Sequence, residues 1–154
     1  LKCRARDGAG PGAACLGAGA GPAWGQALML QICWRAPTPS LLLREDTAVK
    51  ARAAAKIAAF DLNDTLVTST VGAPGYQVTL ADWQYYNASV APRLRELHGQ
   101  GFKVVIFTNQ GNIKAALEGK RALAVRAYID AFLRDLGIPV QVFAATQRDR
   151  FRKP

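Results

Sequence analysis

The sequence predicts an α/β protein built on a doubly wound parallel sheet, and three observations support this fold class. Three short apolar runs, at 57–60, 103–108 and 140–145, have the length and polar boundaries of buried strands. Two stretches with helical spacing, at 92–100 and 114–136, separate them. The connections between these elements are short. Strands that alternate with helices in this way pair in parallel.

The N-terminal part of the chain differs in composition from the rest. Residues 1–40 are rich in Gly, Ala and Pro without a repeat, and such a stretch buries too little side chain to offset its ordering entropy. We expect this segment to be disordered or a linker, with a short apolar helix at Leu28–Trp34 as an alternative. Residues 41–55 would lead into the domain as a helix or with a strand at Leu41–Leu43. The folded body would span residues 56–154.

The segment between the first strand and the first helix is predicted to form turns and a short hairpin. Gly and Pro residues mark the turns. A strand is predicted from three residues that alternate with polar ones: Tyr76, Val78 and Leu80. The aromatic residues Trp83, Tyr85 and Tyr86 follow. They are expected to pack in the core, and stacking on bases at a nucleic-acid end is the functional alternative.

The helices and the C-terminal loop have recognisable boundaries. Pro92 suits the first turn of the first helix, and Gly101 provides its stop. The second helix ends at Gly137. A basic loop, residues 146–154, follows the last strand.

Charge and cysteine content narrow the function classes. The 154-residue chain carries a net charge of +9, which favours a polyanionic partner, nucleic acid first, although a solvated basic surface would give the same total. The three cysteines lack the spacing of a zinc site or a disulfide framework, which favours a reducing, intracellular setting. No apolar run is long enough to cross a bilayer.

Polar side chains follow all three predicted strands. Asp61 ends the first strand, Thr108 and Asn109 end the second, and Lys153 lies just beyond the third. An isolated aspartate after a strand is usually a turn or helix-capping residue. Here the carboxyl ends of parallel strands would bring a carboxylate, a hydroxyl and an ammonium group together. That set suits phosphoryl transfer through an aspartate nucleophile.

These residues carry a family resemblance. The stretch D-L-N-D-T-L from Asp61 resembles the first motif, D-x-D-x-T, of the haloacid-dehalogenase-like phosphatases, F-T-N-Q resembles their second, and R-K-P their third. More narrowly, G-F-K-V-V-I-F-T-N-Q and F-R-K-P are similar to the phosphatase domain of polynucleotide kinase 3′-phosphatases, which repair DNA ends. The match covers Lys56–Pro154 and implies the haloacid-dehalogenase-like, Rossmannoid fold.

The resemblance implies a role for each matching residue. Asp61 would attack a DNA 3′-phosphate to form an aspartyl-phosphate and would also bind Mg²⁺. Position 63 would give its main-chain carbonyl to the metal and its side chain as general acid and base. Thr108 and the backbone of Asn109 would hold phosphate oxygens, and Lys153 would orient Asp61 and offset charge. The resemblance further implies a nuclear protein that acts as a monomer on DNA with 3′-phosphate ends, alone or with other DNA-repair proteins.

The chain departs from the family pattern in two respects. The acid/base aspartate is Asn63, whose amide cannot donate a proton to the leaving oxygen, and the usual glycine after it is Asp64, which adds a carboxylate. The sequence also stops at Pro154, before the family's fourth, acidic motif and the last strands. We therefore expect weak or no phosphatase activity from this chain.

Two other functions remain open from the sequence. One is a phosphatase of the same superfamily that acts on a small phosphorylated metabolite. The other is a non-catalytic module that binds DNA ends, in which Asn63 has removed the chemistry and left phosphate recognition in place.

Overall fold

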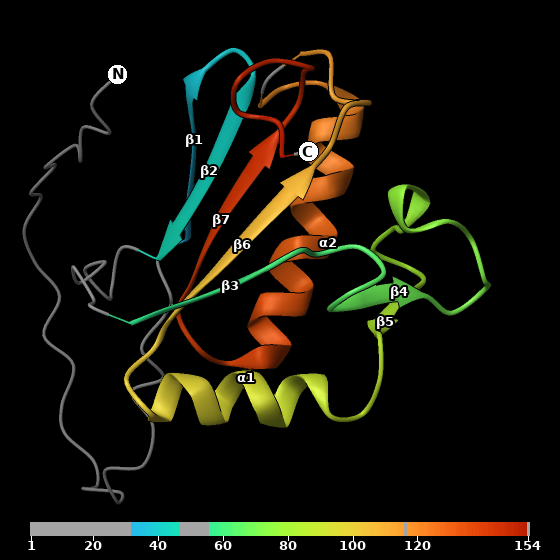
Figure 1. Ribbon diagram of the computed structural model, residues 1–154. Coiled ribbons are helices and arrows are strands. Elements are labelled where there is room, and N and C mark those ends of the chain that lie inside the picture. The colour runs from blue at the N-terminus through green and yellow to red at the C-terminus, as the bar shows by residue number, and fades with distance from the viewer. Residues whose placement is uncertain (1–31, 47–55, 116, 154) are drawn as a thin grey trace, which may run out of the picture.

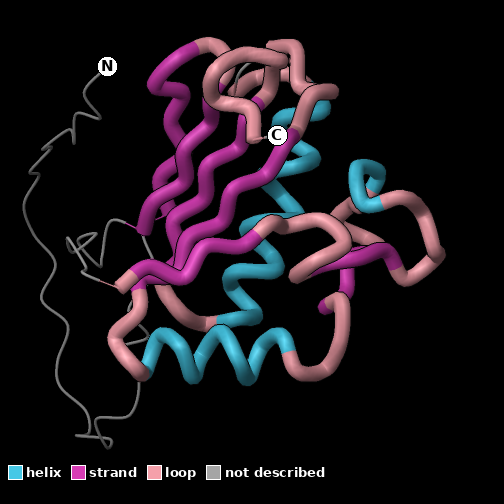
Figure 2. Tube along the Cα trace, viewed as in Figure 1, coloured by secondary structure: helices cyan, strands magenta, loops and turns pink. Residues whose placement is uncertain are grey.

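A computed structural model describes residues 32–46, 56–115 and 117–153. They form a five-stranded sheet in the order β1-β2-β7-β6-β3, a two-stranded sheet β4-β5, and two α-helices (Figures 1 and 2). The elements in chain order are β1 (Ile32–Thr38), β2 (Leu41–Asp46), β3 (Ile57–Phe60), β4 (Val67–Ser69), the 3₁₀ turn η1 (Gly75–Gln77), β5 (Trp83–Tyr85), α1 (Val90–Gly99), β6 (Lys103–Asn109), α2 (Lys120–Leu136) and β7 (Val140–Ala145). No helix among these is long and apolar enough to span a membrane.

The three predicted strands form the parallel centre of the large sheet. β6 pairs in parallel with β3 on one side and with β7 on the other. In register, Phe60 lies beside Ile106, and Ile106 lies beside Val142. The carboxyl ends of the three strands therefore lie at one edge of the sheet, where open α/β sheets place their ligands.

Both helices cover the same face of the sheet. Leu94 of α1 and Phe132 of α2 belong to one buried cluster with Ile106 and Val142 of the sheet. The reason is topological. The chain steps in one direction from β3 to β6 to β7, and right-handed crossovers then place both helices on one side. The described residues form a mixed α/β sheet with a single helical layer, and the helices on both faces that a doubly wound sheet requires are not observed among them.

The N-terminal expectation is wrong for residues 32–40. Instead of a disordered segment or an apolar helix, these residues form β1 and the turn into β2, and β2 pairs antiparallel with β7. The Gly, Ala and Pro content that predicts disorder for residues 1–40 is concentrated in residues 1–25, and Pro37 lies within β1. As an edge strand, β1 tolerates a proline, and its pairing is irregular between Arg35 and Thr38. Residues 1–31 and 47–55 lie outside the described residues.

The β1–β2 hairpin is joined to α2 through Asp130. The Asp130 carboxylate accepts hydrogen bonds from Trp34 Nε1 at 3.0 Å and Arg44 Nε at 2.9 Å. The Arg44 side chain is only 2% exposed and also donates to the Val140 carbonyl at 3.2 Å. A buried guanidinium is tolerated only where its charge is paired. The Asp130 carboxylate is therefore the partner that allows the Arg44 side chain to be buried.

We expect Asp130→Ala to lower the free energy of unfolding by about 3–5 kcal/mol, because it leaves Arg44 buried without its counter-charge. Urea denaturation measures the loss. Arg35→Ala is the matched control, since Arg35 pairs with Glu45 on the exposed side of the same hairpin and should cost less than about 1 kcal/mol. Equal losses in the two variants would contradict this account of the hairpin.

The segment that follows β3 forms a flap, residues 62–86, beside the large sheet. Its strands are β4 and β5, and the strand expected around Tyr76 and Val78 is instead η1 and a turn. Trp83 and Tyr85 make edge-to-face contacts with Phe132 of α2, which confirms core packing for both. Those contacts fix the base of the flap on the helical layer.

The start of the second helix also differs from expectation. α2 begins at Lys120, after Gly119, and not at Lys114. Tyr128 and Phe132 are buried as expected, but Leu123 is 52% exposed. The later start leaves residues 110–115 and 117–119 as a loop at the carboxyl end of β6.

Candidate active site at the carboxyl edge of the sheet

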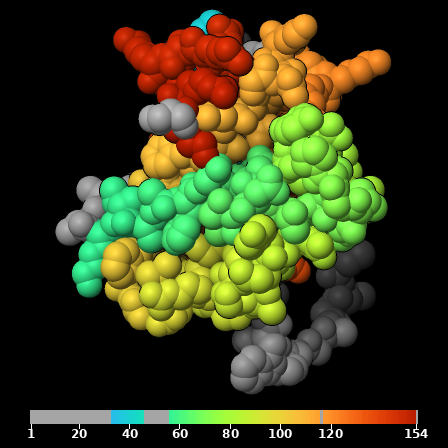
Figure 3. All heavy atoms as spheres, turned by 45° about the vertical axis from the view of Figure 1, so that its right-hand side comes forward, coloured from blue at the N-terminus to red at the C-terminus, as the bar shows by residue number. Residues whose placement is uncertain are grey.

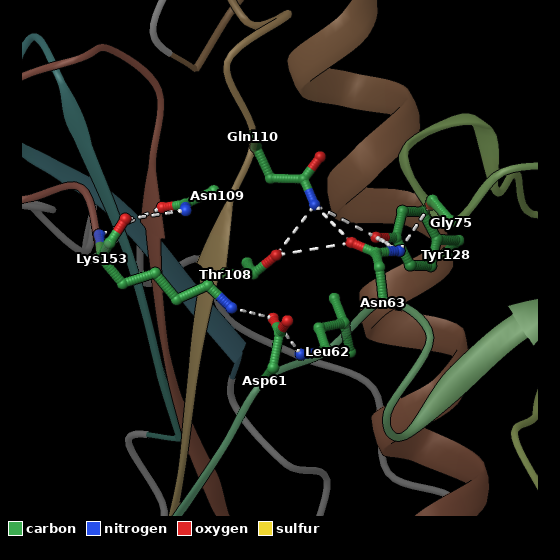
Figure 4. Close-up of polar contacts among 9 residues, drawn as sticks. All are labelled: Asp61, Leu62, Asn63, Gly75, Thr108, Asn109, Gln110, Tyr128 and Lys153. Atoms are coloured by element: carbon green, nitrogen blue, oxygen red, sulfur yellow. Dashed lines mark hydrogen bonds and ion pairs between the residues drawn. The ribbon is translucent and has the colours of Figure 1, made fainter.

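Asp61 and Lys153 form an ion pair where β3 ends. Lys153 Nζ lies 2.5 Å from Asp61 Oδ1, and the Leu62 amide donates to the same oxygen at 2.7 Å (Figure 4). The side chains are 33% and 40% exposed, so a ligand can reach them. The pair joins the end of the first predicted strand to the loop beyond the third strand. Lys153 follows Asp61 by 92 residues in the sequence (153 − 61).

Asn109 holds the loop that carries Lys153. The Asn109 side chain donates to the Lys153 carbonyl at 3.1 Å and accepts from the Lys153 amide at 3.2 Å. The Asn109 carboxamide thus pairs with both main-chain polar groups of Lys153, as a neighbouring strand would. The Asn109 side chain therefore positions the loop that carries Lys153, and the binding of phosphate by the Asn109 backbone stays a prediction.

Thr108 lies at the carboxyl end of β6 and faces the helical layer. Its side chain is 3% exposed, and its Oγ1 lies 3.0 Å from Gln110 Nε2 and 3.4 Å from Asn63 Oδ1. Asp61, Thr108 and Lys153 therefore converge on one edge of the sheet, and this predicted placement is confirmed. Gln110 is the last residue of the F-T-N-Q stretch, and the resemblance gave it no function of its own. Its 4% exposure and its three polar contacts mark it as part of the site.

Asn63 is the centre of a hydrogen-bond network. Its Nδ2 donates to the Gly75 carbonyl at 2.7 Å and to Tyr128 Oη at 3.2 Å, and its Oδ1 accepts from Gln110 Nε2 at 2.9 Å (Figure 4). Burial raises the pKa of Tyr128 to about 12, so this hydroxyl stays neutral at physiological pH. The amide is fully paired, and it ties the flap to α2 and β6.

Asp64 occupies a backbone position that suits glycine. Its φ of 57° lies in the left-handed region, where a β-carbon is strained and where Asp and Asn are the better-tolerated exceptions. The Asp64 carboxylate lies against Gly75, at a place where a β-carbon on residue 75 would collide with it. The turn of the flap at Gly75 thus packs closely against both Asn63 and Asp64.

Asp64→Gly should raise the free energy of unfolding by about 1 kcal/mol, because glycine adopts positive φ without steric cost. The hydrogen bond that the Asp64 main-chain amide donates to the Val67 carbonyl, 2.8 Å long, is kept in this variant. Thermal or urea unfolding measures the gain. As a control, Asp149→Gly removes an exposed acidic group elsewhere on the edge and should not stabilise the chain; a loss of stability in Asp64→Gly would contradict the strain argument.

Basic residues surround this edge of the sheet. The loop after β7 and the loop after β6 crowd together at one end of the molecule (red and orange in Figure 3). A pocket of about 220 Å³ opens beside them, with Phe107 and Phe143 stacked in its wall at 5.1 Å between ring centroids. Arg150, Arg152 and Lys153 also line it. The pocket therefore offers positive charge to an anionic ligand, and Lys153 connects it with Asp61.

The oxygen donors near Asp61 are few. Among the described residues, no group of three or more Asp, Glu, His or Cys side chains is close enough to hold a metal. Lys153 and the Leu62 amide both contact Oδ1 of Asp61, so Oδ2 is the Asp61 oxygen that a cation would take. The second protein ligand that the resemblance implies is the main-chain carbonyl of Asn63. Such a set fits Mg²⁺, which keeps several waters and is often shared with substrate phosphates.

The fold and the site together define an α/β domain that presents a paired aspartate, a threonine and a lysine at the carboxyl edge of a parallel sheet. Residues 56–154 match the family model described as polynucleotide kinase 3 phosphatase, and the chain belongs to this family.

The relatives that match the chain include two polynucleotide phosphatases. A bifunctional polynucleotide phosphatase/kinase from Schizosaccharomyces pombe is 33% identical over 99 residues, which are 64% of this chain and 24% of that protein. A polynucleotide 3′-phosphatase, ZDP, from Arabidopsis thaliana is 32% identical over 134 residues, 79% of this chain and 18% of that protein. The chain thus spans less than a quarter of the length of either relative.

Proposed function

We propose that residues 56–154 belong to a DNA 3′-phosphatase domain that repairs DNA ends through an aspartyl-phosphate intermediate. The observation that carries this proposal is the 2.5 Å pair of Asp61 and Lys153, with Thr108 on the same edge, in a chain of the polynucleotide kinase 3 phosphatase family. We also propose that the protein is nuclear, as the resemblance implies, and that the whole domain has the haloacid-dehalogenase-like fold.

Each residue has a chemical task in this proposal. A carboxylate oxygen of Asp61 attacks the phosphorus atom, the bond to the 3′-oxygen of the deoxyribose breaks, and a phosphoryl group is left on the carboxylate; the leaving 3′-oxygen takes its proton from solvent water. Lys153 orients Asp61 and neutralises charge on the phosphoryl oxygens. Thr108 donates a hydrogen bond to one of these oxygens. Water then releases phosphate from Asp61.

Mg²⁺ would be held by Asp61 and the Asn63 carbonyl and would neutralise part of the phosphate charge. The described residues supply few ligands for it, so we expect its binding to depend strongly on the phosphate itself. The side chain of Asn63 supplies no proton, and this predicts slow turnover.

The basic edge supports DNA as the substrate. Arg150, Arg152 and Lys153 contribute three positive charges next to the pocket, and phosphate contacts of this kind dominate affinity for nucleic acids. One observation favours a second candidate, a DNA-end binding module. The Asn63 amide is fully hydrogen bonded, so the network is complete without an acid at this position.

Phosphate release from a 3′-phosphorylated oligonucleotide and from sugar phosphates, each with Mg²⁺, tests the proposal. We expect slow release from the oligonucleotide and none above background from the sugar phosphates. Tight binding of the oligonucleotide without release would favour the binding module. Faster turnover of sugar phosphates would show that the substrate class is wrong.

A further inference from the structure

The hydrogen-bond network around Asn63 has a fixed direction. The Gly75 carbonyl can only accept, so the Asn63 atom 2.7 Å from it must be the nitrogen. Asn63 Oδ1 then faces Gln110 and Thr108. Because Oδ1 can only accept, the Gln110 atom 2.9 Å from it must be a donor, Nε2.

Gln110 extends this order of donors and acceptors to Thr108. The same Nε2 lies 3.0 Å from Thr108 Oγ1, so the hydroxyl oxygen accepts a hydrogen bond from Gln110. A hydroxyl has one proton, and here that proton must be donated elsewhere. Its partner within the described residues is Asn63 Oδ1 at 3.4 Å, a long and therefore weak bond.

We propose that Gln110 is a positioning residue that keeps the Thr108 hydroxyl as a donor for a terminal oxygen of the substrate phosphate. A phosphate oxygen only accepts, and its negative charge makes the bond stronger than the weak one to Asn63. The hydroxyl proton turns from Asn63 to the phosphate, and Gln110 remains in place. This inference rests on the proposed function, because it assumes that a phosphate binds at Thr108.

A purely structural role for Gln110 makes a different forecast. At 4% exposure, its removal can loosen the edge of the sheet and weaken the binding of any DNA. A positioning role acts on the phosphate alone. The useful quantity is therefore a ratio of two dissociation constants. It is the constant for an oligonucleotide with a 3′-hydroxyl divided by the constant for the same oligonucleotide with a 3′-phosphate.

The ratio can be measured by fluorescence anisotropy in EDTA, which prevents Mg²⁺-dependent hydrolysis. In the unmodified chain, we expect a ratio well above one. Gln110→Met, of similar length but without a donor, should lower it by roughly 10-fold, the scale of a hydrogen bond to a charged group. Gln110→Glu should lower it further, because the hydroxyl proton would then turn to the carboxylate. Thr108→Ser should preserve it.

A double variant separates direct from indirect effects. Thr108→Val removes the hydroxyl, so adding Gln110→Met to it should cause no further fall in the ratio. An unchanged ratio in both Gln110→Met and Gln110→Glu, even with weaker binding of both oligonucleotides, would overturn the positioning role. A ratio of one in the unmodified chain would instead overturn the proposed function on which it rests.

Discussion

Asn63→Asp is expected to increase phosphate release from a 3′-phosphorylated oligonucleotide by about 10²-fold or more, the scale of general acid–base catalysis. The new carboxyl group would face the Gly75 carbonyl, which Asn63 Nδ2 approaches to 2.7 Å. An acceptor at that distance favours the protonated carboxyl, because only that form can donate to it. This is the form that a leaving oxygen needs. Initial rates at saturating oligonucleotide and Mg²⁺ measure the effect.

The contribution of Asp64 must be separated from that of position 63. If the Asp64 carboxylate already serves as the acid, Asp64→Gly with Asn63 retained abolishes the remaining turnover. If it does not, Asp64→Gly changes turnover little and only relieves the backbone strain at φ 57°. Full activity in Asp64→Gly with Asn63 retained would show that position 63 is not the acid/base residue.

Lys153→Met is expected to reduce phosphate release by roughly 10²–10³-fold in the Asn63→Asp background, the loss found when one group that stabilises transition-state charge is removed. The ammonium group lies 2.5 Å from Asp61, so its removal also frees the carboxylate to turn away from the phosphate. Methionine keeps the length of the side chain and its packing. Rates at saturating substrate measure the chemical contribution apart from DNA affinity.

Lys103→Met is the matched control for this change. Lys103 begins β6 and is paired with Ile57, at the opposite end of the sheet from the strand ends that carry the site. Both variants lower the net charge by one, so they weaken general attraction to DNA alike. Equal losses of rate in the two variants would show that Lys153 acts only through net charge.

The fold could be predicted where hydrophobic periodicity is strong and local. The strands at 57–60, 103–108 and 140–145 and the two helices follow from apolar runs and from Gly and Pro boundaries, and their parallel pairing follows from their alternation. Of the hairpin β1–β2, the alternative of a strand at Leu41–Leu43 is confirmed within β2, whereas β1 could not be predicted in this way. The stability of the hairpin comes from β7 and from the contact of Arg44 with Asp130, 86 residues away in sequence.

The site was predictable in position and less so in detail. Strand ends placed Asp61, Thr108 and Lys153 together, because a parallel sheet aligns them. The function of Asn109 in holding Lys153, and that of Gln110 beside Thr108, depend on side-chain contacts that no spacing in the sequence reveals. The one available signal was their place directly after Thr108, in a turn at the sheet edge.

The most direct measurement compares phosphate release by Asn63→Asp and by Asn63→Asp with Asp61→Asn, on the same 3′-phosphorylated oligonucleotide with Mg²⁺. If Asp61 is the nucleophile of a 3′-phosphatase site, the single variant releases phosphate and the double variant releases none above background, because an amide cannot form the aspartyl-phosphate. Equal rates in the two variants would contradict the assignment of this edge of the sheet as the active site.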